Sequence, residues 1–230
     1  MLNIAHSFDS QLFVFLNSLF HHRLWEMFLV MLASKWLWLF GHVLLGVVLM
    51  VGGYQRMSPL QRSVKTLFMR GGICPLAILL SLTLVLSHVL SSYVLKETIQ
   101  RERPCYGNND SNNDSNKEFS PSRMSQEQRT KRIFQPLGCH SRYGMPSNHG
   151  VHFAALAAGV WWFFGSSMLA FWLALVAVIV GFSRVFLGLH YPADVVVGWG
   201  FGIGVVWLIK VLSLRIAYFS KGRAVWVVAK

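Results

Sequence analysis

The chain has 230 residues, of which 54% are hydrophobic and only 13% are charged. Because soluble domains carry about 25% charged residues, this composition excludes an ordinary soluble domain and predicts an integral membrane protein. The formal net charge is +12. In a soluble protein this charge would suggest nucleic-acid binding. In a membrane protein its distribution between the loops matters more, so we expect no nucleic-acid partner.

The sequence contains six apolar segments, whose lengths we judge against the roughly 20 residues that a helix needs to cross hydrocarbon. They lie near residues 24–33, 36–53, 72–95, 149–165, 167–186 and 193–214. They predict an all-α fold, a polytopic bundle of six transmembrane helices embedded in the lipid bilayer. Glu26 interrupts the first segment. Residues 8–20 are therefore an alternative first element, an amphipathic helix that lies in the membrane interface.

Basic residues divide the loops between the two sides of the membrane. The loop after the second segment and the C-terminal tail each carry four basic residues and no acid, and such loops stay in the cytoplasm. Residues 96–147 instead mix nine basic with six acidic residues. Six spans place this long loop on the opposite side, so we expect it to face the exterior. The small size suggests a bacterial inner membrane, with the loop facing the periplasm or exterior.

One membrane domain is expected over residues 1–230, with a polar loop insertion at about 105–140. Residues 108–116 are a low-complexity run of Asn, Asp and Ser, which predicts disorder. Cys105 and Cys139 lie near the two ends of the insertion. A disulfide between them would tie these ends together, and two free thiols are the alternative, because cysteine positions alone fix no geometry.

Lys96 and Arg103 follow the third apolar segment and are seven residues apart. On a helix this spacing is two turns, so a third helix extended past the membrane would present both cations on one face, and Pro104 would end it. The alternative is a pair of interfacial cations whose long side chains reach water at the end of a transmembrane helix.

Pro146, Ser147, Asn148 and His149 precede the fourth apolar segment. Ser147 suits the N-cap position, and the free backbone N–H groups at such a helix start bind anions. His149 would fall in the first turn, within reach of the leaving oxygen of a bound phosphate. The alternative is an ordinary capped helix with an interfacial histidine. His152, one turn on, is expected to be a core or supporting residue.

Ser183 and Arg184 end the fifth segment, and His190 and Asp194 flank the start of the sixth. Pro192 suits a first helical turn, which leaves His190 outside the helix and Asp194 within that turn. A carboxylate placed there can accept an imidazole N–H, fix the tautomer and leave the other nitrogen as a nucleophile. A structural Asp–His pair is the alternative. Ionisable groups in a membrane are costly, which favours a function.

In this order, the three stretches resemble the three motifs of the type 2 phosphatidic acid phosphatase superfamily. The motifs read Lys, six residues, Arg-Pro; Pro-Ser-x-His; and Ser-Arg, five residues, His, three residues, Asp. The resemblance extends over about residues 72–214. It implies a six-helix bundle and a metal-independent phosphatase without a cofactor, whose substrate is a membrane lipid phosphate.

The resemblance also implies a role for each matching residue. His190 would be the nucleophile that forms a phosphohistidine, Asp194 would orient it, and His149 would protonate the leaving group. The residues that bind phosphate would be Lys96, Arg103, Ser147, Asn148 and Arg184. Asn148 departs from the motif, which usually has glycine at that position. We expect the change to be tolerated, because asparagine keeps the backbone N–H and adds a side-chain donor.

The sequence does not distinguish among several lipid phosphates as the substrate. Undecaprenyl diphosphate, phosphatidylglycerophosphate, phosphatidic acid and the lipid A phosphates all combine a tail in hydrocarbon with a phosphate in water. A lipid phosphotransferase with the same phosphohistidine is an alternative. A metal-dependent membrane hydrolase is another, with His149, His152, His190 and Asp194 as ligands. An anion transporter lined by the cations is a third.

Overall fold

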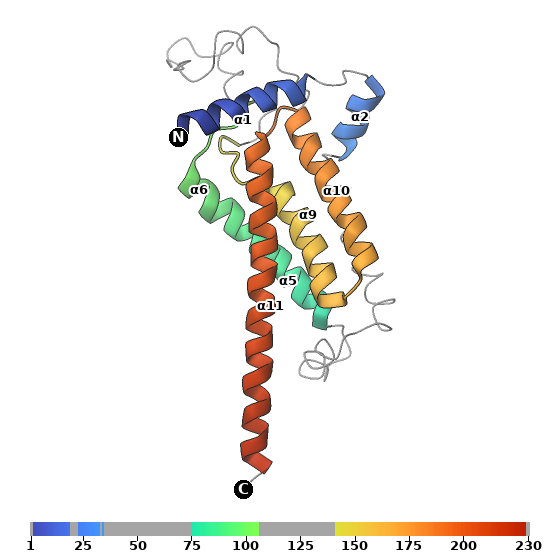
Figure 1. Cartoon of the computed structure of the whole chain (residues 1–230), viewed down its shortest axis with the longest axis vertical. Coiled ribbons are helices and arrows are strands. Elements are labelled where there is room, and N and C mark those ends of the chain that lie inside the picture. Colours follow the sequence, from blue (N-terminus) through green and yellow to red (C-terminus); the bar gives the residue numbers. More distant parts are fainter. Residues whose placement is uncertain (1, 19–22, 33, 35–74, 106–140, 229–230) are drawn as a thin grey trace.

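Figure 1 shows a computed structural model of the chain, which describes residues 2–18, 23–32, 34, 75–105 and 141–228. Every regular element in these ranges is a helix. The predicted segment at 36–53, the disordered run at 108–116 and most of the polar insertion lie outside the described residues. The elements are α1 (Leu2–Asn17), α2 (Arg23–Leu32), α5 (Pro75–Val89), η1 (Leu90–Leu95), α6 (Lys96–Ile99), α9 (Asn148–Gly159), η2 (Val160–Phe164), α10 (Ser167–Phe186) and α11 (Pro192–Val228).

Three of the described helices are long and apolar enough to cross a membrane, over Ile78–Ile99, Ser167–Phe186 and Pro192–Ile216. They correspond to the predicted third, fifth and sixth segments, and the prediction of an all-α membrane fold is confirmed. The predicted fourth segment is α9, which has 12 residues and continues into the 5-residue π-helix η2. The predicted first segment is different. It forms α2, whose 10 residues are about half the ~20 needed to span hydrocarbon.

The first helix, α1, lies across one end of the bundle, over the end of α10 and the start of α11 (Figure 1). Its residues Asp9, Phe13 and Asn17 are buried and repeat every four positions, so they form one face, whereas Phe8 is 66% exposed. The Phe13 ring packs edge-on against Tyr191, and the Asn17 amide donates a 2.6 Å hydrogen bond to the carbonyl of Phe186. The amphipathic interpretation of residues 8–20 agrees with this two-sided helix, although α1 begins earlier and ends at Asn17.

Helices α9 and α11 cross at very short range because α11 has glycine at two positions one turn apart. A Cβ at Gly198 would lie 2.8 Å from the carbonyl oxygen of Ser147, and one at Gly202 would overlap the carbonyl oxygen of Val151. Small residues at this spacing let transmembrane helices approach closely. The crossing therefore brings the start of α9, at Ser147, against the first turns of α11.

Candidate active site

The third helix ends before it reaches Arg103, so the prediction that Lys96 and Arg103 share one helix face is wrong. Helix α6 ends at Ile99, and Gln100 follows in the left-handed conformation with φ of 51°. Pro104 therefore does not end the helix. The chain instead turns back toward the bundle. Lys96 is buried and interacts electrostatically with Arg103, Asp194 and Arg184, so a turn brings the two cations together instead of helical spacing.

Arg103 is held by a short paired segment. Its backbone N–H donates to the carbonyl of Arg142 at 3.0 Å, the N–H of Gly144 donates to the carbonyl of Arg101 at 2.7 Å, and Glu102 and Tyr143 form an antiparallel bridge. The Arg103 Nε atom also donates to the carbonyl of Tyr143 at 3.1 Å. These contacts join the chain that leaves α6 to the chain that enters α9.

Ser147 occupies the predicted N-cap position of α9 but makes no capping bond with its side chain. Its backbone N–H donates to the carbonyl of Asp194 at 2.9 Å, which ties the second motif to the third. Its Oγ is buried and has no hydrogen-bond partner among the described residues. A hydroxyl in that position can donate to a phosphate oxygen.

The side chain of Asn148 bonds to η1. Its amide oxygen accepts a 2.8 Å hydrogen bond from the Ser91 hydroxyl, and its amide nitrogen donates to the Ser92 oxygen at 2.8 Å. Asparagine at this position therefore joins α9 to the π-helical segment that leads into Lys96. The backbone N–H of Asn148 is at the helix start, where the anion site is predicted.

Arg184 and His190 are brought together by the loop after α10. The carbonyl of Arg184 accepts hydrogen bonds from the N–H groups of Leu189, at 3.0 Å, and His190, at 3.3 Å. Gly188 allows this reversal with φ of 71°. Arg184 and His190 are both buried, and Arg184 Nε has no partner among the described atoms.

His190 and Asp194 lie side by side at the start of α11. The His190 Nδ1 and Asp194 Oδ2 atoms are 3.5 Å apart, which is longer than a hydrogen bond. Asp194 Oδ2 accepts the backbone N–H of Tyr191 at 3.0 Å. The prediction that Pro192 begins the helix and Asp194 falls in its first turn is confirmed.

Burial and positive charge keep the His190 imidazole neutral. Burial is the larger cause that holds the pKa of His190 well below its ordinary value of 6.5, and the charges of Arg103 and Arg184 add to it. A neutral imidazole has a lone pair for nucleophilic attack. His149 interacts electrostatically with Arg184 and His190, so all three predicted motifs meet at the end of the bundle that α1 covers.

Three residues at this site escaped the sequence prediction. Arg101 donates to Asp194 Oδ1 at 2.9 Å and also pairs with Asp9 of α1. Gly144 lies between the motifs, since a Cβ there would be 2.9 Å from Asp194 Oδ2 and 3.0 Å from Arg103 Cγ. Nothing in the sequence singles out Arg101 or Asp9, because neither is part of a motif.

His152 is close to His88, with ring centroids 5.2 Å apart, on the side of α9 that faces α5. Among the described residues, no group of three or more His, Cys, Asp and Glu side chains is arranged to hold a metal ion.

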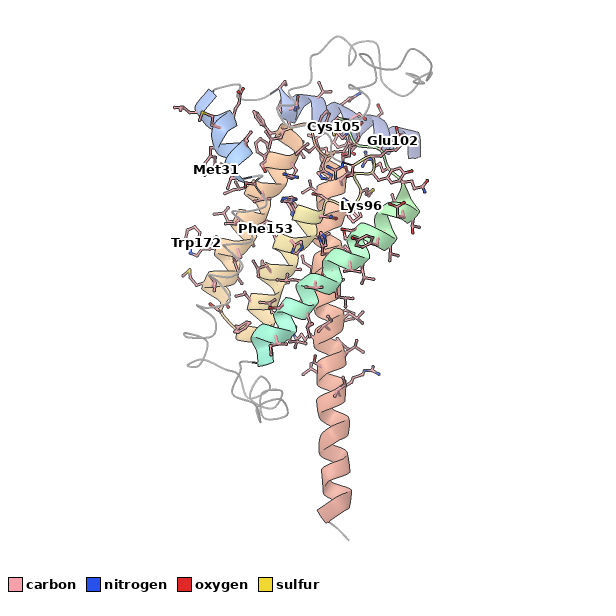
Figure 2. All side chains as sticks on the ribbon, turned by 180° about the vertical axis from the view of Figure 1, so that it is seen from behind. Met31, Lys96, Glu102, Cys105, Phe153 and Trp172 are labelled. Carbon is pink, nitrogen blue, oxygen red and sulfur yellow. The ribbon has the colours of Figure 1, made fainter. Side chains whose placement is uncertain are left out.

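Figure 2 shows Lys96, Glu102 and Cys105 at the same end of the bundle. Cys105 is buried and disulfide-bonded. The other two cysteines lie outside the described residues, so its pairing with Cys139 stays a prediction.

Comparison with known proteins agrees with this arrangement. The family model of the PAP2 superfamily matches residues 75–217. The chain therefore belongs to the PAP2 superfamily of membrane phosphatases, and the predicted resemblance is confirmed.

A curated relative and a solved structure, both from Bacillus subtilis, are similar to this chain. Phosphatidylglycerophosphatase B of strain 168 is 29% identical over 103 residues, which is 41% of this chain and 51% of the relative, so the match spans about half of that protein. The crystal structure of a transmembrane PAP2-type phosphatidylglycerolphosphate phosphatase is similar with a TM-score of 0.55 and 20% identity, over 94% of this chain and 87% of that one. At this identity the second similarity shows the shared fold alone.

Proposed function

We propose that this protein is a metal-independent lipid phosphatase that works through a phosphohistidine on His190. Lys96, Arg103 and Arg184 bind the phosphate oxygens, together with the Ser147 hydroxyl and the backbone N–H of Asn148. Asp194 orients His190, and His149 is the general acid. The protein is a six-helix bundle in a bacterial inner membrane, with its site at the exterior face and no cofactor.

One observation carries this proposal: three predicted site residues have buried polar atoms without a partner among the described residues. These atoms are Ser147 Oγ, Arg184 Nε and His190 Nδ1. Buried polar groups are nearly always hydrogen-bonded, so three such exceptions among the predicted site residues call for an explanation. A bound phosphate supplies acceptors to Ser147 and Arg184, and an imidazolium formed on His190 would shorten its contact with Asp194.

The proposed reaction is a phosphoryl transfer in two steps and involves no oxidation or reduction. The His190 nitrogen remote from Asp194 attacks phosphorus, while the bond between phosphorus and the lipid oxygen breaks. His149, which must enter this step protonated, gives its proton to that oxygen. Water then attacks the phosphohistidine, His149 takes the water proton, and phosphate leaves as the P–N bond breaks. The cations oppose the charge that the equatorial oxygens carry in both transition states.

The substrate class follows from the position of the site. The three apolar helices keep the tail of a lipid in hydrocarbon while its phosphate reaches the buried cations at the helix ends. The relative's name, phosphatidylglycerophosphatase B, makes phosphatidylglycerophosphate the first substrate to test. Undecaprenyl diphosphate, phosphatidic acid and lipid A phosphates complete the panel.

The decisive experiment measures phosphate release by the purified protein from this panel in the presence of EDTA. A His190→Ala variant serves as the blank, and brief incubation with radiolabelled substrate should leave acid-labile, alkali-stable label on the wild type alone. We expect release and labelling to require His190. Release that persists in His190→Ala, or that EDTA abolishes, would contradict the mechanism. Label passed to a second lipid instead of water would identify a phosphotransferase.

A further inference from the structure

We propose that Arg101 and Asp9 are positioning residues that hold the Asp194 carboxylate in its orientation toward the His190 imidazole. Helix α1, which carries Asp9, is then part of the active site. This inference rests on the proposed function, because it assigns a task to residues that contact the proposed nucleophile–carboxylate pair. Neither residue belongs to the motifs that predicted the site.

The contacts form a continuous chain from α1 to the nucleophile. The two terminal nitrogens of the Arg101 guanidinium pair with different carboxylates, Nη1 with Asp194 Oδ1 at 2.9 Å and Nη2 with Asp9 Oδ2. The other oxygen of Asp9 accepts the backbone N–H of Ala193 at 2.9 Å. Asp9 therefore bonds both to Arg101 and to the backbone of the residue next to Asp194.

This bonding decides which oxygen of Asp194 is turned toward the nucleophile. Arg101 occupies Oδ1, while Oδ2 accepts the Tyr191 N–H and lies 3.5 Å from His190 Nδ1. With Oδ1 fixed on one side, the carboxylate cannot rotate away from the imidazole. A guanidinium suits this task because its planar fork donates in two fixed directions at once.

Arg101 is itself held on three sides. Its guanidinium carbon lies 4.4 Å from the centre of the Tyr191 ring, and its carbonyl accepts the Gly144 N–H at 2.7 Å. The Arg101 and Asp9 side chains are only 16% and 10% exposed, and Asp194 is fully buried. A charged group in such surroundings needs its partner, because a buried charge left unpaired is strongly unfavourable.

The charges also explain why two carboxylates accompany one arginine. Arg101 alone would neutralise Asp194, and a neutral pair would do little to stabilise an imidazolium. Asp9 adds a second negative charge, so the three side chains of Asp9, Arg101 and Asp194 together carry a net charge of −1. The chain therefore fixes Asp194 without cancelling the negative charge that His190 needs as it becomes positive.

The test compares kcat and KM of four variants on the preferred lipid phosphate: Arg101→Gln, Arg101→Lys, Asp9→Asn and the Arg101→Gln/Asp9→Asn double variant. We expect Arg101→Gln to lower kcat about 10- to 100-fold, by analogy with residues that orient the ligands of metal sites, with KM changed by less than about 2-fold. Arg101→Lys should recover part of that loss. Asp9→Asn should lower kcat by less, and the double variant should be no slower than Arg101→Gln alone, since both act through Asp194.

Arg142 provides a matched control. It lies on the paired segment, forms a 2.6 Å ion pair with Glu102 and stacks over Tyr143, but its side chain is 57% exposed. Arg142→Gln should leave kcat and KM at the wild-type values. Melting temperatures of all variants report folding, and if Arg101→Gln does not fold, Arg101→Lys and Asp9→Asn decide the question.

Each result has one meaning. A raised KM with unchanged kcat in Arg101→Gln would show that Arg101 binds phosphate, and multiplying losses in the double variant would show independent roles. Either result overturns the inference, as does wild-type kcat in both Arg101→Gln and Asp9→Asn. A wild type that is inactive on every lipid phosphate would instead refute the proposed function.

Discussion

A methyl group at position 144 would have no room. The Cβ of an alanine there would lie 2.9 Å from Asp194 Oδ2, 3.0 Å from Arg103 Cγ and 3.5 Å from His190 Nδ1. We expect Gly144→Ala to push these groups apart and to lower kcat about 100-fold, because a displacement of about 1 Å is enough for such a loss. Steady-state kinetics on the preferred substrate measure the effect.

Gly200→Ala is the control for that substitution. Gly200 is on α11, and a Cβ there would meet nothing within 4 Å. Its kcat should equal that of the wild type. Equal activity of the two variants would mean that the close packing around Gly144 does not hold the site.

The neutral state of His190 predicts how stability depends on pH. The pKa of His190 is held well below 6.5 in the folded protein, mainly by burial, whereas the unfolded chain takes up the proton near 6.5. Below that pH the unfolded state binds more protons, so the free energy of unfolding falls as the pH falls. Between about pH 7.5 and pH 5 the wild type should therefore lose more thermal stability than His190→Gln. Parallel losses in the two proteins would show that His190 does not resist protonation.

At the scale of single residues, the sequence was informative where a motif was local. The pattern after residue 183 placed His190 outside α11 and Asp194 in its first turn, because Pro192 marks a helix start. Arg101 and Asp9 could not be predicted. Arg101 is 93 residues from Asp194 and 92 residues from Asp9 along the chain, and only the tertiary fold brings the three residues together.

The crossing of α9 and α11 is the element-scale feature that fixes the site. A Cβ at Gly202 would overlap the carbonyl oxygen of Val151, so Gly202→Ala should force the helices apart and lower the free energy of unfolding by about 1–3 kcal/mol, as overpacking does. Thermal denaturation in detergent measures the change.

Gly204→Ala is the matched variant for this crossing. Gly204 is two residues farther along α11, and a Cβ there would have nothing within 4 Å. It should melt at the wild-type temperature or slightly above, since alanine favours a helix. Equal melting temperatures for both variants would contradict the role of the crossing.

Element boundaries were predictable where apolar length alone decides them. The predicted segment at 167–186 coincides with α10. The third helix was extended too far in the prediction, because a left-handed Gln100 ends it and no sequence signal distinguishes that glutamine from a helical one. The segment at 24–33 forms the 10-residue α2, and an apolar run of that length fits a short packed helix as well as part of a span.

At the scale of the whole molecule, the cysteine chemistry tests the orientation in the membrane. Cys105 is buried and disulfide-bonded, and disulfides persist on the oxidising side of a bacterial inner membrane. Protein from freshly isolated membranes should therefore run differently on gels with and without reductant. Cys105→Ser should abolish the difference, Cys139→Ser should abolish it if the predicted pairing holds, and Cys74→Ser should keep it. A free Cys105 thiol in those membranes would place the site on the cytoplasmic side.

The hydrogen bond from the Ala193 N–H to Asp9 joins residues 184 positions apart, so we expect this contact to form late during synthesis of the chain. Chains emerge from the ribosome with the N-terminus first, and contacts between distant residues form late. A nascent chain that ends before Asp194 already contains Lys96, Arg103 and Arg184, the cations proposed to bind phosphate, but it has no carboxylate beside His190. If the proposed function holds, we expect phosphatase activity to begin only after α11 has been synthesised and inserted.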